Sequence, residues 1–227
     1  MLYTIADLHL SLGTDKPMDV FSGWRDYVER LEKNWRAIVN EEDTVVLAGD
    51  LSWAMKLEDT AADFAFLNAL PGQKLLLKGN HDYWWTTAKK MTDFFTQSGF
   101  STLRIVHNNA YPVGNVCVCG TRGWSYDCEK EEDLKILNRE CGRLRASLDC
   151  ARKTDLEPVV FLHYPPVYGD YVCAEILDVL KERGVRRCYY GHIHGAAAKR
   201  AVQGAFDGIS FRMVSCDTTG FMPVLVP

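Results

Sequence analysis

The segment Lys74–Trp85, KLLLKGNHDYWW, joins a short apolar run to a group of polar side chains. Three consecutive leucines, at positions 75–77, are typical of a buried strand. An amide, an imidazole and a carboxylate follow them directly, at Asn80, His81 and Asp82. The segment therefore predicts a core strand whose carboxyl end carries residues suited to chemistry.

Four other strand-like apolar runs end in a similar way. Carboxylate, imidazole and amide oxygen bind hard and borderline divalent metals, and ligands of open α/β sheets collect at the carboxyl ends of the strands. Residues two apart on an extended segment face the same side, so each Asp-x-His or His-x-His pair can reach one centre. The polar residues that follow these runs are Asp7 and His9, Asp50, His163, and His192 with His194.

Each of these residues, taken alone, has an ordinary structural interpretation. A lone histidine is usually a satisfied core or surface residue, and a Gly-Asp pair after a strand is usually only a turn. Five of the six histidines nevertheless fall at the ends of predicted strands, and only His107 lies outside. The joint pattern therefore predicts a metal site at the carboxyl edge of a sheet.

The composition is that of an ordinary globular protein. The chain has 227 residues, 47% of them apolar and 25% charged, which excludes disorder, collagen and fibrous coiled coil. Its net charge of −4 argues against nucleic acid as a partner, although a nucleotide substrate stays open. No apolar stretch approaches the roughly 18 residues of a membrane span, and the N-terminus lacks a basic signal-peptide region. We therefore expect a cytoplasmic protein with no membrane partner, whose eight cysteines are reduced and mostly buried.

Strand-length runs alternate with helical periodicity along much of the chain. Strands follow one another near residues 103–120 and again after residue 209, which predicts an α/β or α+β layered domain with a mixed sheet. We expect one domain over residues 1–227 and a long loop at 11–23. The long helix in the segment 129–153 either covers a sheet or overhangs the site. Apolar residues spaced three and four apart predict helices around residues 24–38, 64–70, 134–151 and 172–180.

The strand-end residues, in this order, resemble the complete signature of the calcineurin-like metallophosphoesterase superfamily, over residues 7–194. The resemblance implies a four-layer αββα sandwich, in which two mixed β-sheets pack face to face between helices. A less specific likeness to a bacterial branch of predicted phosphohydrolases comes from four short motifs. These are KPMD at 16–19, GTRGW at 120–124, HYPP at 163–166 and SCD at 215–217.

The resemblance also implies a site for two divalent metal ions. The first metal would be held by Asp7, His9, Asp50 and His194. The second would be held by Asp50, Asn80, His163 and His192, so that Asp50 bridges. Manganese, iron and zinc suit these mixed ligands, and manganese is our expectation. Two cations about 3.5–4 Å apart can share a hydroxide and deliver it in line to a phosphorus atom.

Three further residues have expected roles beside the metals. His81 is not a ligand, and it can protonate the leaving oxygen or stabilise the phosphoryl charge. Asp82 is expected to orient the His81 imidazole and favour its protonated form, or to cap the helix that follows. Arg122 is expected to clamp a substrate phosphate, or to pair with a nearby acid. Aromatic residues near the site can stack on a base or sugar or can pack in the core: Trp53, Tyr83, Trp84, Trp85, Trp124 and Tyr168.

The sequence therefore predicts a dimetal phosphoesterase for a small phosphorylated substrate, a phosphomonoester or phosphodiester, with a nucleotide as one option. One alternative is a nuclease or protein phosphatase of the same superfamily. The excess of acidic residues and the lack of a basic run weigh against a nuclease. The other alternative is a binding scaffold without turnover. Retention of all seven ligands and of His81 weighs against it.

Overall fold

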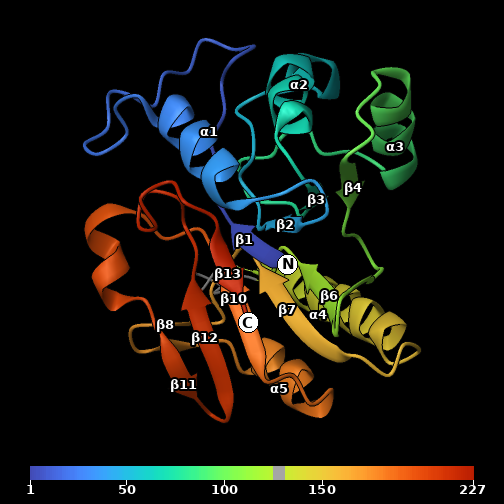
Figure 1. Cartoon of the computed structure of the whole chain (residues 1–227). Helices are drawn as coiled ribbons and strands as arrows, with labels where there is room; N and C mark the ends of the chain where they lie inside the picture. The colour runs from blue at the N-terminus through green and yellow to red at the C-terminus, as the bar shows by residue number, and fades with distance from the viewer. Residues whose placement is uncertain (125–130) are drawn as a thin grey trace.

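The structure is a computed structural model that describes residues 1–124 and 131–227. Two large β-sheets lie face to face at its centre (Figure 1). The first sheet has the order β13-β1-β2-β3-β4, with β1 (Leu2–Ile5), β2 (Thr44–Leu47), β3 (Gln73–Leu76), β4 (Leu103–Ile105) and β13 (Val224–Val226). The second has the order β11-β12-β10-β7-β6-β5, with β5 (Tyr111–Val113), β6 (Val116–Thr121), β7 (Glu157–Leu162), β10 (Arg187–Tyr190), β11 (Gly204–Phe206) and β12 (Ile209–Met213).

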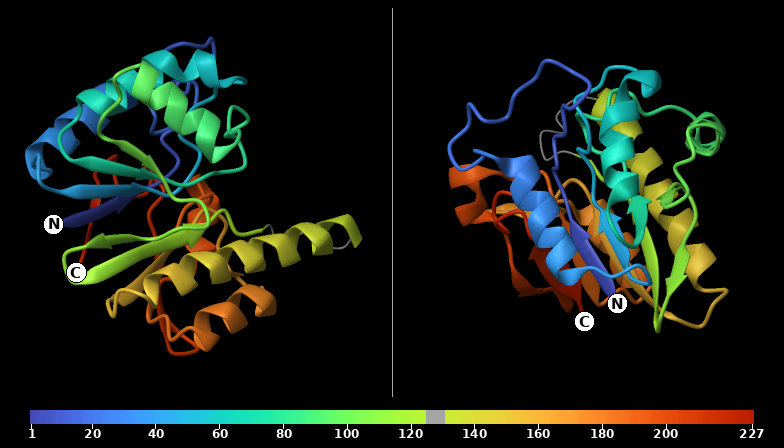
Figure 2. Two further views of the ribbon diagram at one scale, coloured as in Figure 1. Left: turned by 90° about the vertical axis from the view of Figure 1, so that its right-hand side faces the viewer. Right: turned by 45° about the horizontal axis from the view of Figure 1, so that its top comes forward.

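Helices cover the outer faces of both sheets, which makes four layers (Figure 2). The first sheet is covered by α1 (Tyr27–Ile38), α2 (Ala61–Ala69) and α3 (Ala88–Gln97), and the second by α4 (Glu131–Ala151) and α5 (Ala174–Glu182). Two short 3-10 helices, η1 (Leu57–Thr60) and η2 (Gly195–Arg200), and the hairpin of β8 (Val167–Tyr168) and β9 (Tyr171–Val172) complete the described elements. The four-layer sandwich expected from the resemblance is confirmed.

The central strands are apolar at nearly every position because both of their faces are buried. In β2, Val45 and Leu47 pack under the helices of the first sheet, while Val46 packs between the two sheets. In β6, Cys117 packs under α4 and α5, while Val118 faces the first sheet. Successive side chains of a strand point to opposite faces, so each strand contributes to two of the three cores.

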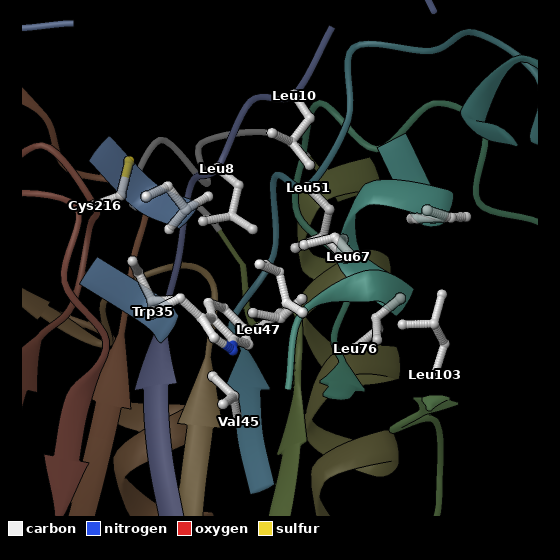
Figure 3. Packing of buried hydrophobic residues seen from close by; sticks show 14 of the residues in the cluster. Leu8, Leu10, Trp35, Val45, Leu47, Leu51, Leu67, Leu76, Leu103 and Cys216 are labelled. Atoms are coloured by element: carbon white, nitrogen blue, oxygen red, sulfur yellow. The ribbon is translucent and has the colours of Figure 1, made fainter. Parts of the chain in front are cut away.

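The helix-covered core of the first sheet includes Trp35 of α1 (Figure 3). Trp35 is completely buried, and its indole N–H donates a hydrogen bond of 3.0 Å to the carbonyl of Pro71. Leu47 and Leu67 belong to the same cluster, as Figure 3 shows. This packing fixes β2 immediately before the chain reaches Asp50.

The strands that carry the predicted site residues run in one direction. β1, β2 and β3 are parallel to one another, and so are β7 and β10. The end of β1 also bonds to the segment that follows β12: the Ala6 N–H donates to the carbonyl of Val214, and the Cys216 N–H donates to the carbonyl of Ala6. This link joins the carboxyl edges of the two sheets, so their strand-end loops meet in one region.

Several elements differ from the sequence expectations. The periodicity predicted one mixed sheet, but the structure divides the strands between two. Helix α3 was not predicted from its apolar spacing, although Met91 and Phe95 form its buried side. The short strands β5, β8, β9 and β11 were missed because two or three residues carry too little periodicity. Helix α4 covers the second sheet, which was one of the two expectations for the long helix in the segment 129–153. Positions 129–130 of that segment lie outside the described residues.

Two other features of the described chain bear on the expectations. Residues 11–23 contain no helix or strand, as predicted for a long loop. None of the helices in the described ranges is both long and apolar enough to cross a membrane.

We expect Leu47→Ala to lower the free energy of unfolding by about 2–5 kcal/mol, because it opens a cavity in a completely buried cluster. Leu225→Ala is the matched control, since Leu225 is 47% exposed on the edge strand β13, and it should change stability by about 0.5 kcal/mol or less. Unfolding in urea, monitored by circular dichroism, measures the free energy of unfolding of both variants. Equal effects of the two substitutions would contradict the placement of β2 in the core.

Candidate metal centre

The structure brings together the side chains expected to hold the first metal. His194 Nε2 lies 3.5 Å from Asp7 Oδ1, and His9 Nε2 lies 3.7 Å from Asp50 Oδ2. One ligand atom from each of Asp7, His9 and His194 lies within 4.8 Å of the others. These residues come from the ends of β1, β2 and β10, in both sheets.

The side chains expected to hold the second metal meet on the other side of Asp50. His163 Nε2 lies 3.5 Å from Asp50 Oδ2 and 2.7 Å from Asn80 Oδ1. His192 Nδ1 lies 2.9 Å from the same Asn80 oxygen. The same carboxylate oxygen of Asp50 thus faces His9 and His163, one from each expected set.

Left-handed backbone conformations direct these side chains inward. Asp7, His9, Asp50 and His192 have φ angles of 62°, 46°, 54° and 73°. Non-glycine residues adopt such angles rarely, at a cost of about 1–3 kcal/mol each. The expectation that each pair shares one side of an extended segment is therefore wrong: β1 ends at Ile5, and the convergence comes from turns that follow the strands.

Two glycines permit the close approach of these turns. A Cβ on Gly79 would lie 2.0 Å from Asp50 Oδ1 and 2.2 Å from the Asp50 nitrogen. A Cβ on Gly191 would lie 2.6 Å from Asp7 Oδ2 and 2.6 Å from the Ala6 Cβ. The glycines before Asn80 and His192 therefore leave room for the two central carboxylates.

Asp82 connects the turn after β2 to the turn after β3. Its fully buried carboxylate accepts hydrogen bonds from the backbone N–H groups of Asp50 (2.9 Å), Leu51 (2.8 Å), Ser52 (3.4 Å) and Gly79 (2.7 Å). The indole N–H of Trp84 donates a further bond of 3.0 Å. Five donors therefore hold this side chain between the loops.

Neither expected role of Asp82 matches these contacts. Among the described residues, no hydrogen bond or ion pair joins its carboxylate to the His81 imidazole. The following helix α3 is capped by Thr87, whose side chain accepts from the Lys90 N–H. Both expectations rested on proximity in sequence, whereas the Asp82 side chain points back toward Asp50.

His163 has a defined hydrogen-bonding arrangement. Its Nδ1 lies 3.1 Å from the carbonyl oxygen of Ala48, an acceptor, so Nδ1 donates and Nε2 carries the lone pair. That lone pair faces the oxygens of Asn80 and Asp50. Three electron-pair donors thus converge at this point, which is an arrangement that a cation stabilises.

The electrostatics of the cluster also fit a divalent cation. Burial and the nearby carboxylates of Asp82 and Asp7 raise the pKa of Asp50 well above its usual value. Burial lowers the pKa of His9 and of His192 to about 3, so both imidazoles are neutral, the form that binds metal. His9 Nδ1 is buried without a hydrogen-bond partner among the described residues. Neutral imidazoles beside buried carboxylates are the ligand chemistry of manganese, iron or zinc.

Asp217 is a residue of the site that the sequence analysis missed. Its Oδ1 lies 3.0 Å from His194 Nδ1, and its Oδ2 accepts the Gly195 N–H at 2.9 Å. Burial lowers the pKa of His194, but Asp7 and Asp217 outweigh burial and raise that pKa to about 10. Asp217 belongs to the motif SCD at 215–217. Its position shortly after a predicted strand, like that of the other site residues, could have identified it. Asp217 orients His194 so that Nε2 faces Asp7.

His81 lies beside the cluster and is half-buried. Its backbone N–H donates to Asp50 Oδ1 at 2.8 Å, and its ring centroid lies 4.7 Å from Trp53 and 5.7 Å from His9. Burial, followed by the charge of His163, lowers the pKa of His81. The backbone is thus tied to the central carboxylate while the imidazole stays accessible.

The aromatic residues near the site divide between the two alternatives. Trp53 stacks on His9 with ring centroids 4.9 Å apart, and Lys16 Nζ lies 4.7 Å from the Trp53 ring. Tyr83 is 54% exposed, and its hydroxyl is 3.5 Å from His81 Nδ1. Trp84, in contrast, is buried in the core of the first sheet.

The other three aromatic residues pack against a core. Trp124 and Tyr168 are partly buried against the core of the second sheet, and Trp85 is partly buried against that of the first.

Arg122 is placed beside the centre by its backbone. Its carbonyl accepts the N–H groups of His163 (3.1 Å) and Tyr164 (2.9 Å). Its guanidinium lies 3.9 Å from Glu140 and 4.7 Å from the Trp124 ring. Arg122 therefore forms the expected ion pair with an acid, Glu140, although the two groups are at a long distance.

We expect Asp82→Asn to destabilise the protein by at least about 2 kcal/mol, because an amide presents N–H donors to backbone N–H groups. The same change should weaken the binding of Mn²⁺, since the Asp50 turn loses its support. Asp93→Asn is the matched control, because Asp93 is exposed and pairs only with Lys89 among the described residues. Chemical unfolding and metal titration measure the two effects. Stability and Mn²⁺ affinity equal to those of the control would contradict the supporting role.

Comparisons with known proteins agree with this geometry. Two solved structures have a similar fold: AQ665 from Aquifex aeolicus, a protein of unknown function, and TT1561 of Thermus thermophilus. The first is 14% identical with a TM-score of 0.53, over 99% of this chain and 94% of that one. The second is 12% identical with a TM-score of 0.57, over 92% and 86%. No curated protein matches the sequence.

The family model for calcineurin-like phosphoesterases matches residues 2–196, which is most of the chain. The chain belongs to the calcineurin-like phosphoesterase family.

Proposed function

We propose that the protein is a dimetal phosphoesterase that hydrolyses a small phosphomonoester or phosphodiester, nucleotides included. One observation carries this proposal: seven side chains of metal-binding types, from five strand ends, converge, and the Asp50 carboxylate lies between the two expected sets. The family membership of the chain supports a phosphoesterase, and the neutral imidazoles support metal binding.

In this proposal each divalent cation has one histidine-rich set of ligands. Asp7, His9, Asp50 and His194 hold the first cation, and Asp50, Asn80, His163 and His192 hold the second. We propose manganese at both positions, because mixed carboxylate, amide and imidazole donors suit it. When bound, the two cations supply neutralisation of the phosphoryl oxygens and activation of water.

The chain itself supplies proton transfer and orientation. His81 donates a proton to the leaving oxygen of the substrate. The Tyr83 hydroxyl lies near its Nδ1, at 3.5 Å, which leaves Nε2 as the nitrogen that faces the substrate. The bond from the His81 N–H to Asp50 holds the imidazole at the edge of the cluster. Trp53, stacked on His9, closes one side of the same space.

Asp82 and Asp217 act as positioning residues in this proposal. Asp82 orients the Asp50 turn through backbone bonds, and Asp217 orients His194 through Nδ1. Arg122 binds an anionic oxygen of the substrate, because its side chain is 18% exposed and its guanidinium makes no hydrogen bond in the described part of the chain. Its distance of 3.9 Å from Glu140 leaves the guanidinium able to reorient.

We expect the purified chain to bind about two Mn²⁺ ions and to lose hydrolysis of 4-nitrophenyl phosphate when a chelator removes them. Asp50→Asn should weaken both binding events together, because one Asp50 oxygen faces His9 and His163. Calorimetric titration and elemental analysis measure the number of Mn²⁺ ions bound per chain. The control Asp93→Asn should bind the same number as the wild type.

Two outcomes would contradict this assignment. Activity that survives complete removal of metal would exclude a metal-dependent phosphoesterase. Two bound ions without hydrolysis of any phosphomonoester or phosphodiester would favour the binding scaffold instead.

We expect His81→Asn to slow hydrolysis of phenyl phosphate by about 10²–10⁴-fold, the usual effect of a lost general acid. The loss should be much smaller for 4-nitrophenyl phosphate, because nitrophenolate departs without a proton. Metal content should stay near that of the wild type, since the bond to Asp50 comes from the backbone N–H and survives the substitution. Equal slowing of both substrates, or loss of a metal, would show that His81 is not the proton donor.

A further inference from the structure

A cavity of about 390 Å³ lies next to the candidate metal centre. It is lined by residues that follow β3 and β4, by the end of β6 and the residue after it, and by one side of α4. Its volume is within the range of about 300–1,000 Å³ that is usual for small-molecule sites. The polar residues that matter here are Lys78, His107, Thr121, Arg122, Glu140 and Arg143.

The cavity and the metal centre share the same carboxyl edge of the sandwich. Strand β4 is the parallel neighbour of β3, and β6 is the parallel neighbour of β7, so the cavity is one strand further along in each sheet. Lys78 stands two residues before Asn80, and the Arg122 carbonyl accepts the His163 N–H. The cavity therefore lies beside the loops that carry Asn80 and His163.

Cationic side chains predominate in the described lining of the cavity, although the whole chain carries a net charge of −4. Lys78, Arg122 and Arg143 face it, against one carboxylate among its described lining residues, that of Glu140. Burial and the charge of Arg143 lower the pKa of His107, which also lines it. The cations therefore outnumber the carboxylate there.

Glu140 organises the cations without neutralising them all. Its carboxylate is completely buried and accepts hydrogen bonds from the Thr121 hydroxyl and from Arg143 Nη1, the latter at 2.6 Å. Arg122 Nη2 lies 3.9 Å away, beyond hydrogen-bond distance, and Arg122 Nε is buried with no partner in the described ranges. The Arg122 side chain, which is 18% exposed and lines the cavity, therefore has hydrogen-bond donors that no described residue uses.

We propose that this cavity binds a second phosphate group of the substrate, so that the protein acts on small bisphosphorylated compounds. Arginine is suited to this role because its planar guanidinium can donate two parallel bonds to one phosphate. Arg122 and Lys78 face the second phosphate from the two sheets, and Arg143 faces it from α4. The inference rests on the proposed phosphoesterase activity and adds the class of substrate to it.

The test measures inhibition of 4-nitrophenyl phosphate hydrolysis by alkanediol bisphosphates of increasing length, each compared with the alkyl monophosphate of the same length. At the best length, the bisphosphate should inhibit at least about tenfold more strongly, the effect of one added charge-assisted contact. Phosphoalkanoic acids of equal length distinguish a second phosphate from a carboxylate. A carboxylate that inhibits as well as the phosphate would overturn the choice of phosphate.

Arg143→Gln should remove the advantage of the bisphosphate and leave the kinetics of 4-nitrophenyl phosphate unchanged. Arg139→Gln is the matched control, because Arg139 is exposed on the same helix and does not line the cavity. Lys78→Met, on a different wall, should give the same loss and is decisive if Arg143→Gln does not fold. An advantage that persists in either folded variant, or is absent from the wild type at every length, overturns the proposal.

The same measurements separate this inference from the proposed function. Failure of the wild type with Mn²⁺ to hydrolyse any phosphomonoester or phosphodiester, 4-nitrophenyl phosphate included, would contradict the phosphoesterase activity itself. Calorimetric binding of the bisphosphates to the wild type and to Arg143→Gln then gives a readout that does not depend on turnover. Equal affinities of these two proteins would overturn the bisphosphate site on its own.

Discussion

The buried carboxylate of Asp82 holds together the two loops on which the metal centre depends. It accepts backbone N–H groups from the turn after β2 and from the turn after β3, and these turns carry Asp50 and Asn80. These N–H groups partly offset the cost of burying the carboxylate, although burial still raises the pKa of Asp82. The negative charge of Asp82 also raises the pKa of Asp50, so the same contact that positions the central carboxylate makes a cation beside it more favourable.

The site has a conformational cost that the cores on either side offset. Four of the expected ligands adopt left-handed backbone angles, and two carboxylates are buried close together. Strained residues persist only where the surrounding structure determines their conformation. Here β1, β2 and β3 are packed on both faces and end directly before the turns, so the turns begin from fixed positions. The stability of the sandwich and the geometry of the centre are therefore linked through the same strands.

Because the strands are divided between two sheets, the candidate metal centre is built from the carboxyl edges of both. The first sheet contributes Asp7, Asp50 and Asn80, and the second contributes the imidazoles of His163 and His192. The cavity beyond Arg122 continues this arrangement by one strand in each sheet. Arg122 links the two regions, since its backbone supports His163 while its side chain faces the cavity. The hydrogen bond from Arg143 to Glu140 holds the Arg143 guanidinium in one position. The sequence suggested that Arg122 either clamps a phosphate or pairs with an acid, and at 3.9 Å from Glu140 it can do both.

Local sequence determined most of the strands and most of the helices, and it marked the polar residues at the strand ends, because apolar periodicity and metal-binding residue types are properties of short segments. The four layers followed from the resemblance to a family rather than from periodicity, which predicted a single mixed sheet. Only the tertiary structure decided how the ligands converge, since left-handed turns replaced the expected alternation at Asp7 and His9. It also decided the partners of Asp82 and the place of Asp217 beside His194, which is 23 residues away in sequence. Such contacts depend on which strands become neighbours in space, and the residues that make them carry no local signal of that pairing.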